Sequence, residues 1–168
     1  MRALIVASLL ASIQASACTA FRIRQPGAVD TGAAYIAVLN VPGILRTGRG
    51  VALGTQRMSD SGTYEASGQL SEAVVNQLMM TGLVQDVCSQ PYTPDAVPDC
   101  NSRRARNEVR VSRLIPVGDS VFAVFIGQRT LRLPGDSLYM PSATTHLCRL
   151  VRGKVTWTVR TCELRMMT

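Results

Sequence analysis

The sequence predicts an α+β domain in which N-terminal helices pack on an antiparallel sheet of four or more strands. Two segments near the start, residues 32–40 and 72–82, carry apolar side chains at helical spacing. From residue 107 onward the apolar period changes to two, which is typical of strands. Helices followed by a run of strands is the element order of the α+β class. We expect residues 31–168 to form this single domain.

Each predicted helix has a recognisable start and end. Asp30 or Thr31 is placed to cap the first, and Ser71 the second. Gly82 is expected to stop the second helix. The Met79-Met80 pair is interpreted as core filling rather than as a metal or cofactor site. The expected core-facing residues of the two helices are Tyr35, Val38, Leu39, Val74, Val75, Leu78 and Met79.

The predicted strands differ in how deeply they should be buried. Residues 50–58 have a strand-like composition, and "EVRVS", residues 108–112, alternates valine with polar residues as a half-buried strand does. "SVFAVFI", residues 120–126, is apolar on both faces and should lie in the middle of the sheet with cover on both sides. Residues 127–133 are expected to extend it. A last hairpin follows over residues 145–164, with Val155, Trp157 and Val159 facing one way.

The first residues have the pattern of an export signal. Arg2 supplies a positive charge, a short apolar run follows, and Ala15-Ser16-Ala17 precedes Cys18. Small residues before a cysteine resemble the bacterial lipobox, although Ala15 stands where that motif prefers leucine. The resemblance implies removal of residues 1–17 and lipidation of Cys18, followed by a tether over residues 18–30. Simple secretion and an uncleaved anchor remain as alternatives.

The cysteine count agrees with export. With Cys18 assigned to lipid, four of the five cysteines remain, an even number for an oxidising compartment. Four cysteines allow three pairings, and the sequence does not choose between them. Cys88 and Cys100 bracket a proline-rich loop that a bond would close, and parity would then pair Cys148 with Cys162. With a turn at Arg152-Gly153, Cys162 would face away from Cys148. That bond therefore requires a β-bulge near residues 160–161 or another register.

The net charge of +7 is concentrated locally. "NSRRARNEVRVSR", residues 101–113, contains a single acid, Glu108. It is either a solvated loop entering a strand or an electrostatic surface for acidic proteins or anionic lipid head groups. Export and the absence of interleaved aromatic residues argue against a nucleic-acid partner. The candidate partner-binding residues are Arg103, Arg104, Arg106, Arg110 and Arg113.

Catalytic and cofactor motifs are missing from the sequence. His146, the only histidine, has no ligand or acid at a recognisable spacing, and neither CxxC nor GxSxG occurs. Gly48-Arg49-Gly50 precedes a strand and so does not fit a nucleotide-binding fingerprint. We therefore expect no catalytic residue, no metal and no cofactor.

The C-terminal segment "CRLVRGKVTWTVRTCEL", residues 148–164, is similar to the final hairpin of NTF2-like proteins. The resemblance implies helices packed in a curved sheet and, in some members, a ligand cavity. It carries over no catalytic residue.

Three functions follow from these observations. The first is a non-catalytic envelope lipoprotein on the periplasmic side of the membrane that binds or braces a partner, for example as an extrinsic subunit of a larger membrane complex. The second is a small-ligand module with a pocket lined by Trp157, Phe125 and Met79. The third is a hydrolase or isomerase, which would need His146 in a cleft beside a carboxylate.

Overall fold

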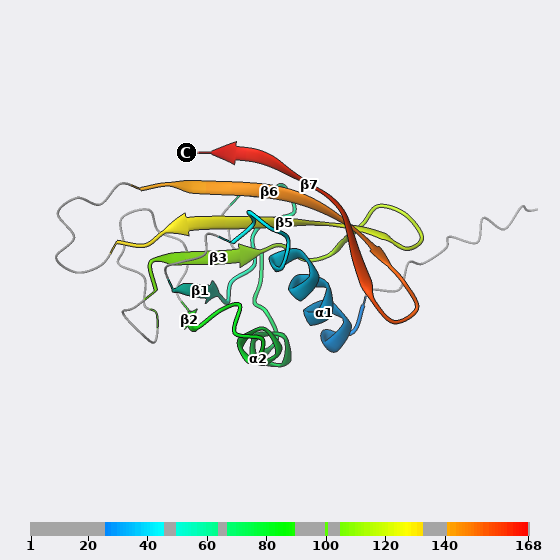
Figure 1. The fold of residues 1–168 in the computed structure, drawn as a ribbon, viewed down its shortest axis with the longest axis horizontal. Coiled ribbons are helices and arrows are strands. Elements are labelled where there is room, and N and C mark those ends of the chain that lie inside the picture. Colours follow the sequence, from blue (N-terminus) through cyan, green and yellow to red (C-terminus); the bar gives the residue numbers. More distant parts are fainter. Residues whose placement is uncertain are drawn as a thin grey trace, which may run out of the picture.

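The computed structural model describes residues 26–45, 50–63, 67–89, 100, 105–132 and 141–167. Within them the chain forms two helices and a seven-stranded sheet (Figure 1). Mixed α/β architecture with a large, mostly antiparallel sheet is therefore confirmed. The elements are α1 (Ala28–Leu39), β1 (Val51–Gly54), α2 (Glu72–Met80), β2 (Asp86–Cys88), β3 (Asn107–Val111), β4 (Ile115–Pro116), β5 (Val121–Thr130), β6 (Ala143–Arg152) and β7 (Trp157–Met167).

The sheet order is β2-β1-β3-β5-β6-β7, with the short β4 paired to β5. The pairs among β3 to β7 are antiparallel, but β1 runs parallel to both β2 and β3. The prediction of a wholly antiparallel sheet is wrong at this end. The reason is that α2 lies between β1 and β2 in the chain and serves as the crossover that parallel neighbours need.

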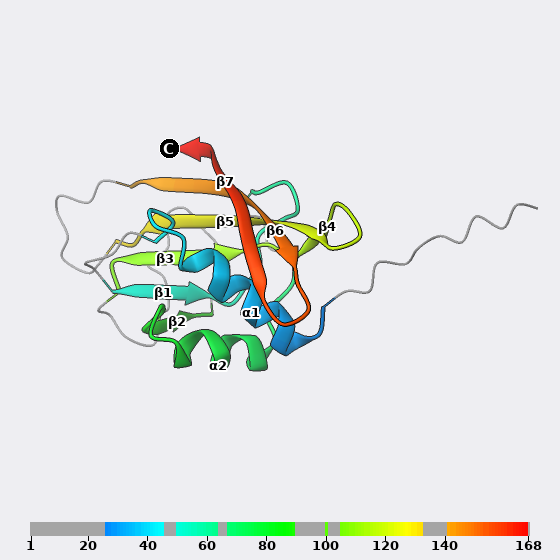
Figure 2. The same ribbon diagram turned by 45° about the vertical axis from the view of Figure 1, so that its right-hand side comes forward.

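One face of the sheet carries the apolar core. Both helices contribute to a single buried cluster with the inward residues of the central strands, and they lie next to each other (Figure 2). The Tyr35 hydroxyl also donates a hydrogen bond of 2.8 Å to the carbonyl oxygen of Ser112, just after β3. Neither helix is long and apolar enough to cross a bilayer.

Most of the predicted core residues of the helices are buried. Tyr35, Val38 and Leu39 are buried, and the inward residues of α2 are buried or half-buried against the same cluster. Met80 is the exception, because its side chain is 88% exposed. Consecutive helical residues point about 100° apart, so Met79 and Met80 could not both face the core.

The start of α1 corrects one boundary. The helix begins at Ala28 with Gly27 as its N-cap, so the last three residues of the predicted tether are helical, and neither Asp30 nor Thr31 is the cap. Instead, Asp30 lies in the first turn and accepts a hydrogen bond of 2.7 Å from the Trp157 indole nitrogen. The second helix has the predicted bounds, with Ser71 at the N-cap position and Gly82 in the left-handed region (φ 73°) just beyond its end. The Ser71 side chain makes no capping hydrogen bond.

The central strand β5 is covered on both faces, as its composition predicts. Phe122 and Val124 are buried within the core cluster. On the opposite face, Phe125 is contacted by Gly62, where an added Cβ would lie 2.5 Å from a ring carbon. That glycine belongs to the segment that follows β1, which ends at Gly54 instead of reaching residue 58.

The final hairpin differs from the simplest register in two ways. Arg152 faces Trp157, so residues 153–156 form the turn, and Val155 there is 93% exposed instead of facing the core. The register then shifts by one residue between Arg149 and Leu150, which brings Cys148 opposite Cys162. The bulge that the sequence requires for this disulfide is therefore present.

Candidate functional site

The basic segment 101–113 does not form one exposed surface. Arg103 and Arg104 lie outside the described residues. Arg106 is half-buried, and Arg113 is exposed and donates a hydrogen bond of 2.7 Å from Nε to the Asp60 carboxylate. Arg110 is 1% exposed, so its assignment as a partner-binding residue is wrong.

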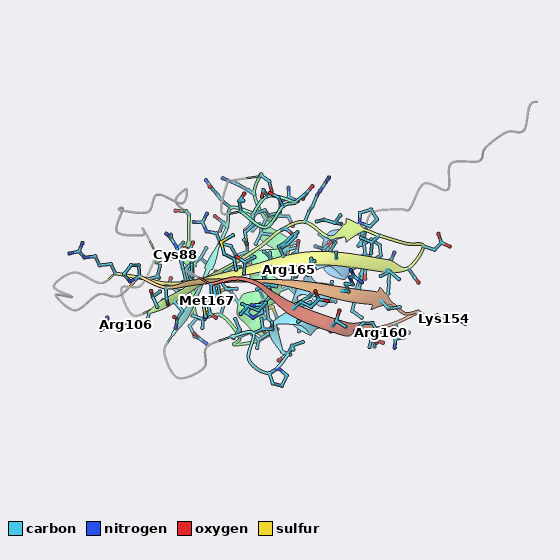
Figure 3. The ribbon with its side chains drawn as sticks, turned by 90° about the horizontal axis from the view of Figure 1, so that it is seen from above. Cys88, Arg106, Lys154, Arg160, Arg165 and Met167 are labelled. Carbon is cyan, nitrogen blue, oxygen red and sulfur yellow. A yellow bond between two sulfur atoms is a disulfide. The ribbon has the colours of Figure 1, made fainter. Side chains whose placement is uncertain are left out.

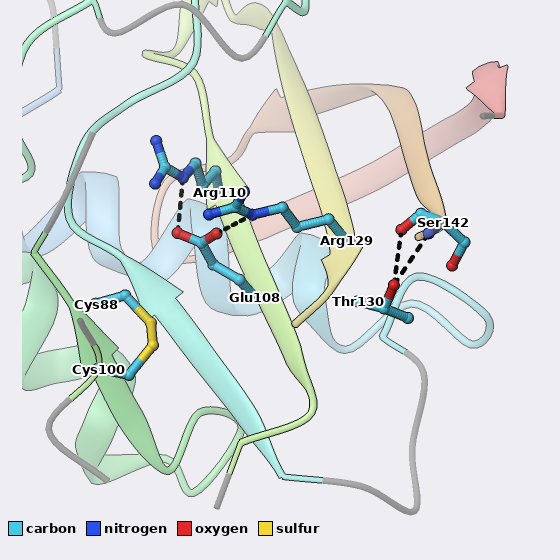
Figure 4. A network of polar contacts seen from close by, with 7 residues as sticks. All are labelled: Cys88, Cys100, Glu108, Arg110, Arg129, Thr130 and Ser142. Atoms are coloured by element: carbon cyan, nitrogen blue, oxygen red, sulfur yellow. Dashed lines mark hydrogen bonds and ion pairs between the residues drawn. A yellow bond between two sulfur atoms is a disulfide. The ribbon is translucent and has the colours of Figure 1, made fainter. Parts of the chain in front are cut away.

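Arg110 belongs to a buried ion cluster in the sheet (Figure 4). Its Nε lies 2.8 Å from one oxygen of Glu108, and Arg129 on β5 binds the other oxygen. Glu108 and Arg129 are directly opposite in the β3–β5 register. Strand β3, predicted to be half-buried, is therefore buried on both faces. On the face away from the helices, the charges of Glu108 and its two arginines compensate each other.

Gly54 on the neighbouring strand makes room for this cluster. A Cβ at that position would lie 2.5 Å from a Glu108 oxygen and 2.7 Å from Arg110 Cγ and Nε. The carboxylate and guanidinium thus occupy the space that a side chain on β1 would fill. Close packing and mutual charge neutralisation indicate a structural role for the three charged residues.

Both predicted disulfides are present, one near each edge of the sheet. Cys88 at the end of β2 is bonded to Cys100, and the two residues also form an isolated antiparallel β-bridge. Cys148 on β6 is bonded to Cys162 on β7. The first bond closes the proline-rich loop, and the second ties the last strand to its neighbour. Disulfide bonds persist in oxidising compartments, so they fit an exported protein. Cys18 lies outside the described residues.

The outer edge of β7 ends the sheet order and is not paired with a further strand in the described part of the chain. This edge, called here the β7 edge, spans Trp157–Met167, eleven residues. Apolar side chains are exposed towards its C-terminal end: Leu164 by 53%, Met166 by 47% and Met167 by 70%. Figure 3 shows Arg160 and Lys154 towards the hairpin turn. Both cations are exposed.

A cavity of about 330 Å³ lies near the start of α1. Its six lining residues include two arginines and no carboxylate: Pro26, Thr31, Tyr35, Arg57, Arg113 and Leu114. None of them is a residue named for the pocket expected from the sequence. Burial raises the pKa of Tyr35 far above its ordinary value, with the Arg57 charge opposing the rise, so the phenol is neutral at physiological pH.

His146 on β6 shows no catalytic arrangement among the described residues. Its strand neighbours are Ile126 and Leu164, and its buried Nδ1 has no hydrogen-bond partner there. Burial lowers the pKa of the imidazole. The described ranges also contain no group of three or more histidine, cysteine or acidic residues that could hold a metal ion.

Comparison with known proteins finds no relative: no protein-family model, no curated protein and no solved structure matches the chain.

Sequence reasoning missed both the β7 edge and the cavity. In "ELRMM", residues 163–167, charged and apolar side chains alternate weakly, and this alternation was the available signal for an exposed end of the last strand. No local signal existed for the cavity, because Tyr35, Arg57 and Arg113 come from three separate segments.

Proposed function

We propose that this protein is an exported, non-catalytic component of the bacterial cell envelope. A lipid on Cys18 would hold it at the periplasmic side of the membrane. Its role would be to bind an acidic, extended segment of a partner protein along the β7 edge, as an extrinsic subunit of a membrane complex. The observation that carries this proposal is the long exposed edge of β7, tied to the sheet by a disulfide.

The disulfides support the location. The four cysteines that follow Cys18 are all bonded in two pairs, as expected where thiols become oxidised. This leaves Cys18 as the one cysteine available for lipid. A short leader ending in small residues before that cysteine would place the folded domain just outside the bilayer.

The edge of β7 supports the binding role. A strand at the end of a sheet presents backbone N–H and C=O groups that another chain can pair with. The Cys148–Cys162 bond holds this strand in place, so little ordering of the strand would be needed when a partner segment binds. Exposed Leu164 and Met167 provide apolar contacts at one end.

Charge supports an acidic partner. The β6–β7 hairpin carries five basic residues and one acid: Arg149, Arg152, Lys154, Arg160 and Arg165 against Glu163. Two of the arginines are paired, Arg152 with Asp30 and Arg165 with Glu163. Arg149, Lys154 and Arg160 are exposed. We therefore propose this hairpin, in place of residues 101–113, as the cationic surface that binds an acidic partner.

Photo-crosslinking in intact cells tests the binding surface. A crosslinking residue would replace exposed Thr161 on β7 or, as a control, exposed Met80 on α2. We expect a discrete adduct with one protein of a membrane complex from Thr161 but not from Met80. The adduct should disappear when Lys154→Glu and Arg160→Glu are combined, and it should persist with Glu72→Lys on α2. Equal adducts from both positions, or adducts that survive the charge reversal, would contradict the proposal.

The anchor is tested separately. Cys18→Ala should move the protein from the membrane fraction to the soluble periplasmic fraction with both disulfides intact. Retention in membranes would rule out the lipid. Four reactive thiols in protein extracted under alkylating conditions would rule out export.

A further inference from the structure

We propose that the cavity between the start of α1, Arg57 and the end of β3 binds a small organic anion. The ligand would present a phosphate or carboxylate to the arginines and a compact apolar body to Leu114 and Pro26. This site lies on different residues from the β7 edge, and it does not depend on a partner binding there.

The chemistry of the lining is cationic. Arg57 and Arg113 both line the cavity, and its six lining residues include no acid. Asp60 approaches from outside the lining and pairs with Arg113. Arg57, in contrast, makes no ion pair with another residue in the described part of the chain. Its guanidinium suits an oxyanion because the N–H groups match two oxygens.

Arg57 also has a buried hydrogen-bond donor that no described residue accepts from. Its Nε is buried and has no hydrogen-bond partner among the described residues. A buried N–H of a charged group that makes no hydrogen bond is destabilising, and an anion in the cavity would remove that penalty.

The backbone holds Arg57 in place without a ligand. Its N–H donates to the Gly68 carbonyl at 2.8 Å, its carbonyl accepts from the Ser67 N–H at 3.0 Å, and the next residue, Met58, bonds to Val111 on β3 at 3.0 Å. The backbone of Arg57 is therefore tied to the sheet, so only the side chain would need ordering on binding.

The remaining lining residues set the kind of molecule. Tyr35 is neutral and does not repel an anion, and its hydroxyl is held by its bond to Ser112. Leu114 and Pro26 add apolar surface. A volume of about 330 Å³ is larger than one inorganic oxyanion needs and falls at the lower end of small-molecule pockets, roughly 300 Å³ and above.

The test uses the full-length, oxidised protein in detergent at fixed ionic strength. Binding of phenyl phosphate and of inorganic phosphate is measured by calorimetry, and the arginine Nε–H resonances are followed by NMR. We expect saturable binding of phenyl phosphate in the millimolar range or tighter, with weaker binding of inorganic phosphate. The Arg57 Nε–H resonance should shift, because that group acquires a partner.

Arg57→Gln should weaken phenyl phosphate binding by about tenfold or more, the worth of a charge-assisted hydrogen bond. Arg160→Gln removes an exposed arginine outside the cavity and should change binding by less than about twofold, as a distant surface site does. If Arg57→Gln does not fold, the resonance of Arg57 in the unmodified protein decides the question. Absence of saturable binding, or equal weakening by the two substitutions, would overturn the proposal.

The source of the anion is separated by competition. Vesicles containing phosphatidylglycerol that displace phenyl phosphate, when phosphatidylcholine vesicles do not, would assign the site to a lipid head group. Binding that neither vesicle affects would assign it to a soluble ester. Both results support the site, and neither depends on the outcome of crosslinking at β7.

Discussion

Two glutamate–arginine pairs in this protein have the same spacing along a strand but different surroundings. Glu108 and Arg110 on β3 are 2.8 Å apart, and Glu163 and Arg165 on β7 are 2.9 Å apart. The first pair is 0% and 1% exposed, whereas the second is 51% and 47% exposed. Strand position therefore decides whether the same pair of residues is part of the interior or part of a surface.

The physical cause lies in the sheet order. β3 has β1 on one side and β5 on the other, and Arg129 on β5 adds a second cation to Glu108. β7 has only β6 beside it in the described chain. Water solvates the outer pair and weakens its attraction, while the inner residues depend on each other for compensation of their charges.

The largest expected effect comes from removing the inner carboxylate. Glu108→Ala removes the buried carboxylate that both Arg110 and Arg129 contact, and it should lower the free energy of unfolding by about 3–5 kcal/mol. Glu163→Ala, the matched change on the edge, should lower it by about 1 kcal/mol or less. Urea denaturation of both variants measures the difference. Equal losses would show that burial does not separate the two pairs.

The next largest effect concerns the disulfides near the two edges. The bonded cysteines are separated by 14 residues in Cys148–Cys162 and by 12 in Cys88–Cys100, so replacing either pair by serine should cost about 3 kcal/mol. Only the loss of Cys148–Cys162 should speed amide hydrogen exchange along β7, because that bond ties β7 to β6. Faster exchange in β7 after loss of Cys88–Cys100 would contradict this separation of roles.

A smaller effect is expected at the glycine beside the inner pair. Gly54→Ala places a Cβ 2.5 Å from Glu108 and should destabilise the protein by about 1–3 kcal/mol through overpacking. Gly118→Ala is the control, since its Cβ would meet Val121 at an ordinary 3.6 Å, and it should change stability by less than about 0.5 kcal/mol. Thermal unfolding distinguishes the two.

The smallest effect is the pH dependence contributed by His146. Burial lowers the pKa of the imidazole below its ordinary 6.5, so the folded state binds fewer protons than the unfolded state. Stability should therefore fall as the pH drops through 6.5. In His146→Leu, the decrease in Tm over the same interval should be shallower. An unchanged slope would show that other groups account for it.

The local patterns predicted much of the secondary structure correctly. Helical spacing identified α2 with its cap and stop, and the double-sided apolar run identified β5 as a covered strand. The proline-rich loop suggested the Cys88–Cys100 bond and parity then suggested Cys148–Cys162, although three pairings were possible from the sequence. The alternation of the last hairpin showed that the second bond needed a bulge or another register. These features depend on neighbouring residues, so the sequence alone contains them.

Lipidation of Cys18, export and the envelope partner stay predictions of the sequence, because they concern processing and binding. The candidate sites depend on contacts between residues that are far apart in the sequence. Arginine is usually exposed, but Arg110 is buried on a strand between two neighbours, where it pairs with Glu108. Arg57 and Tyr35 are far apart in the chain and line one cavity.

What the sequence determined by itself was therefore the periodicity of helices and strands, the bounds of the second helix, and an even number of cysteines available for disulfides. The tertiary structure alone decided which charged residues are buried, which strand is left at an edge, and which distant side chains line a common cavity. The reason is that the free energy of a charge depends on the solvent and the opposite charges around it, and these are set by strands and helices that are remote in sequence.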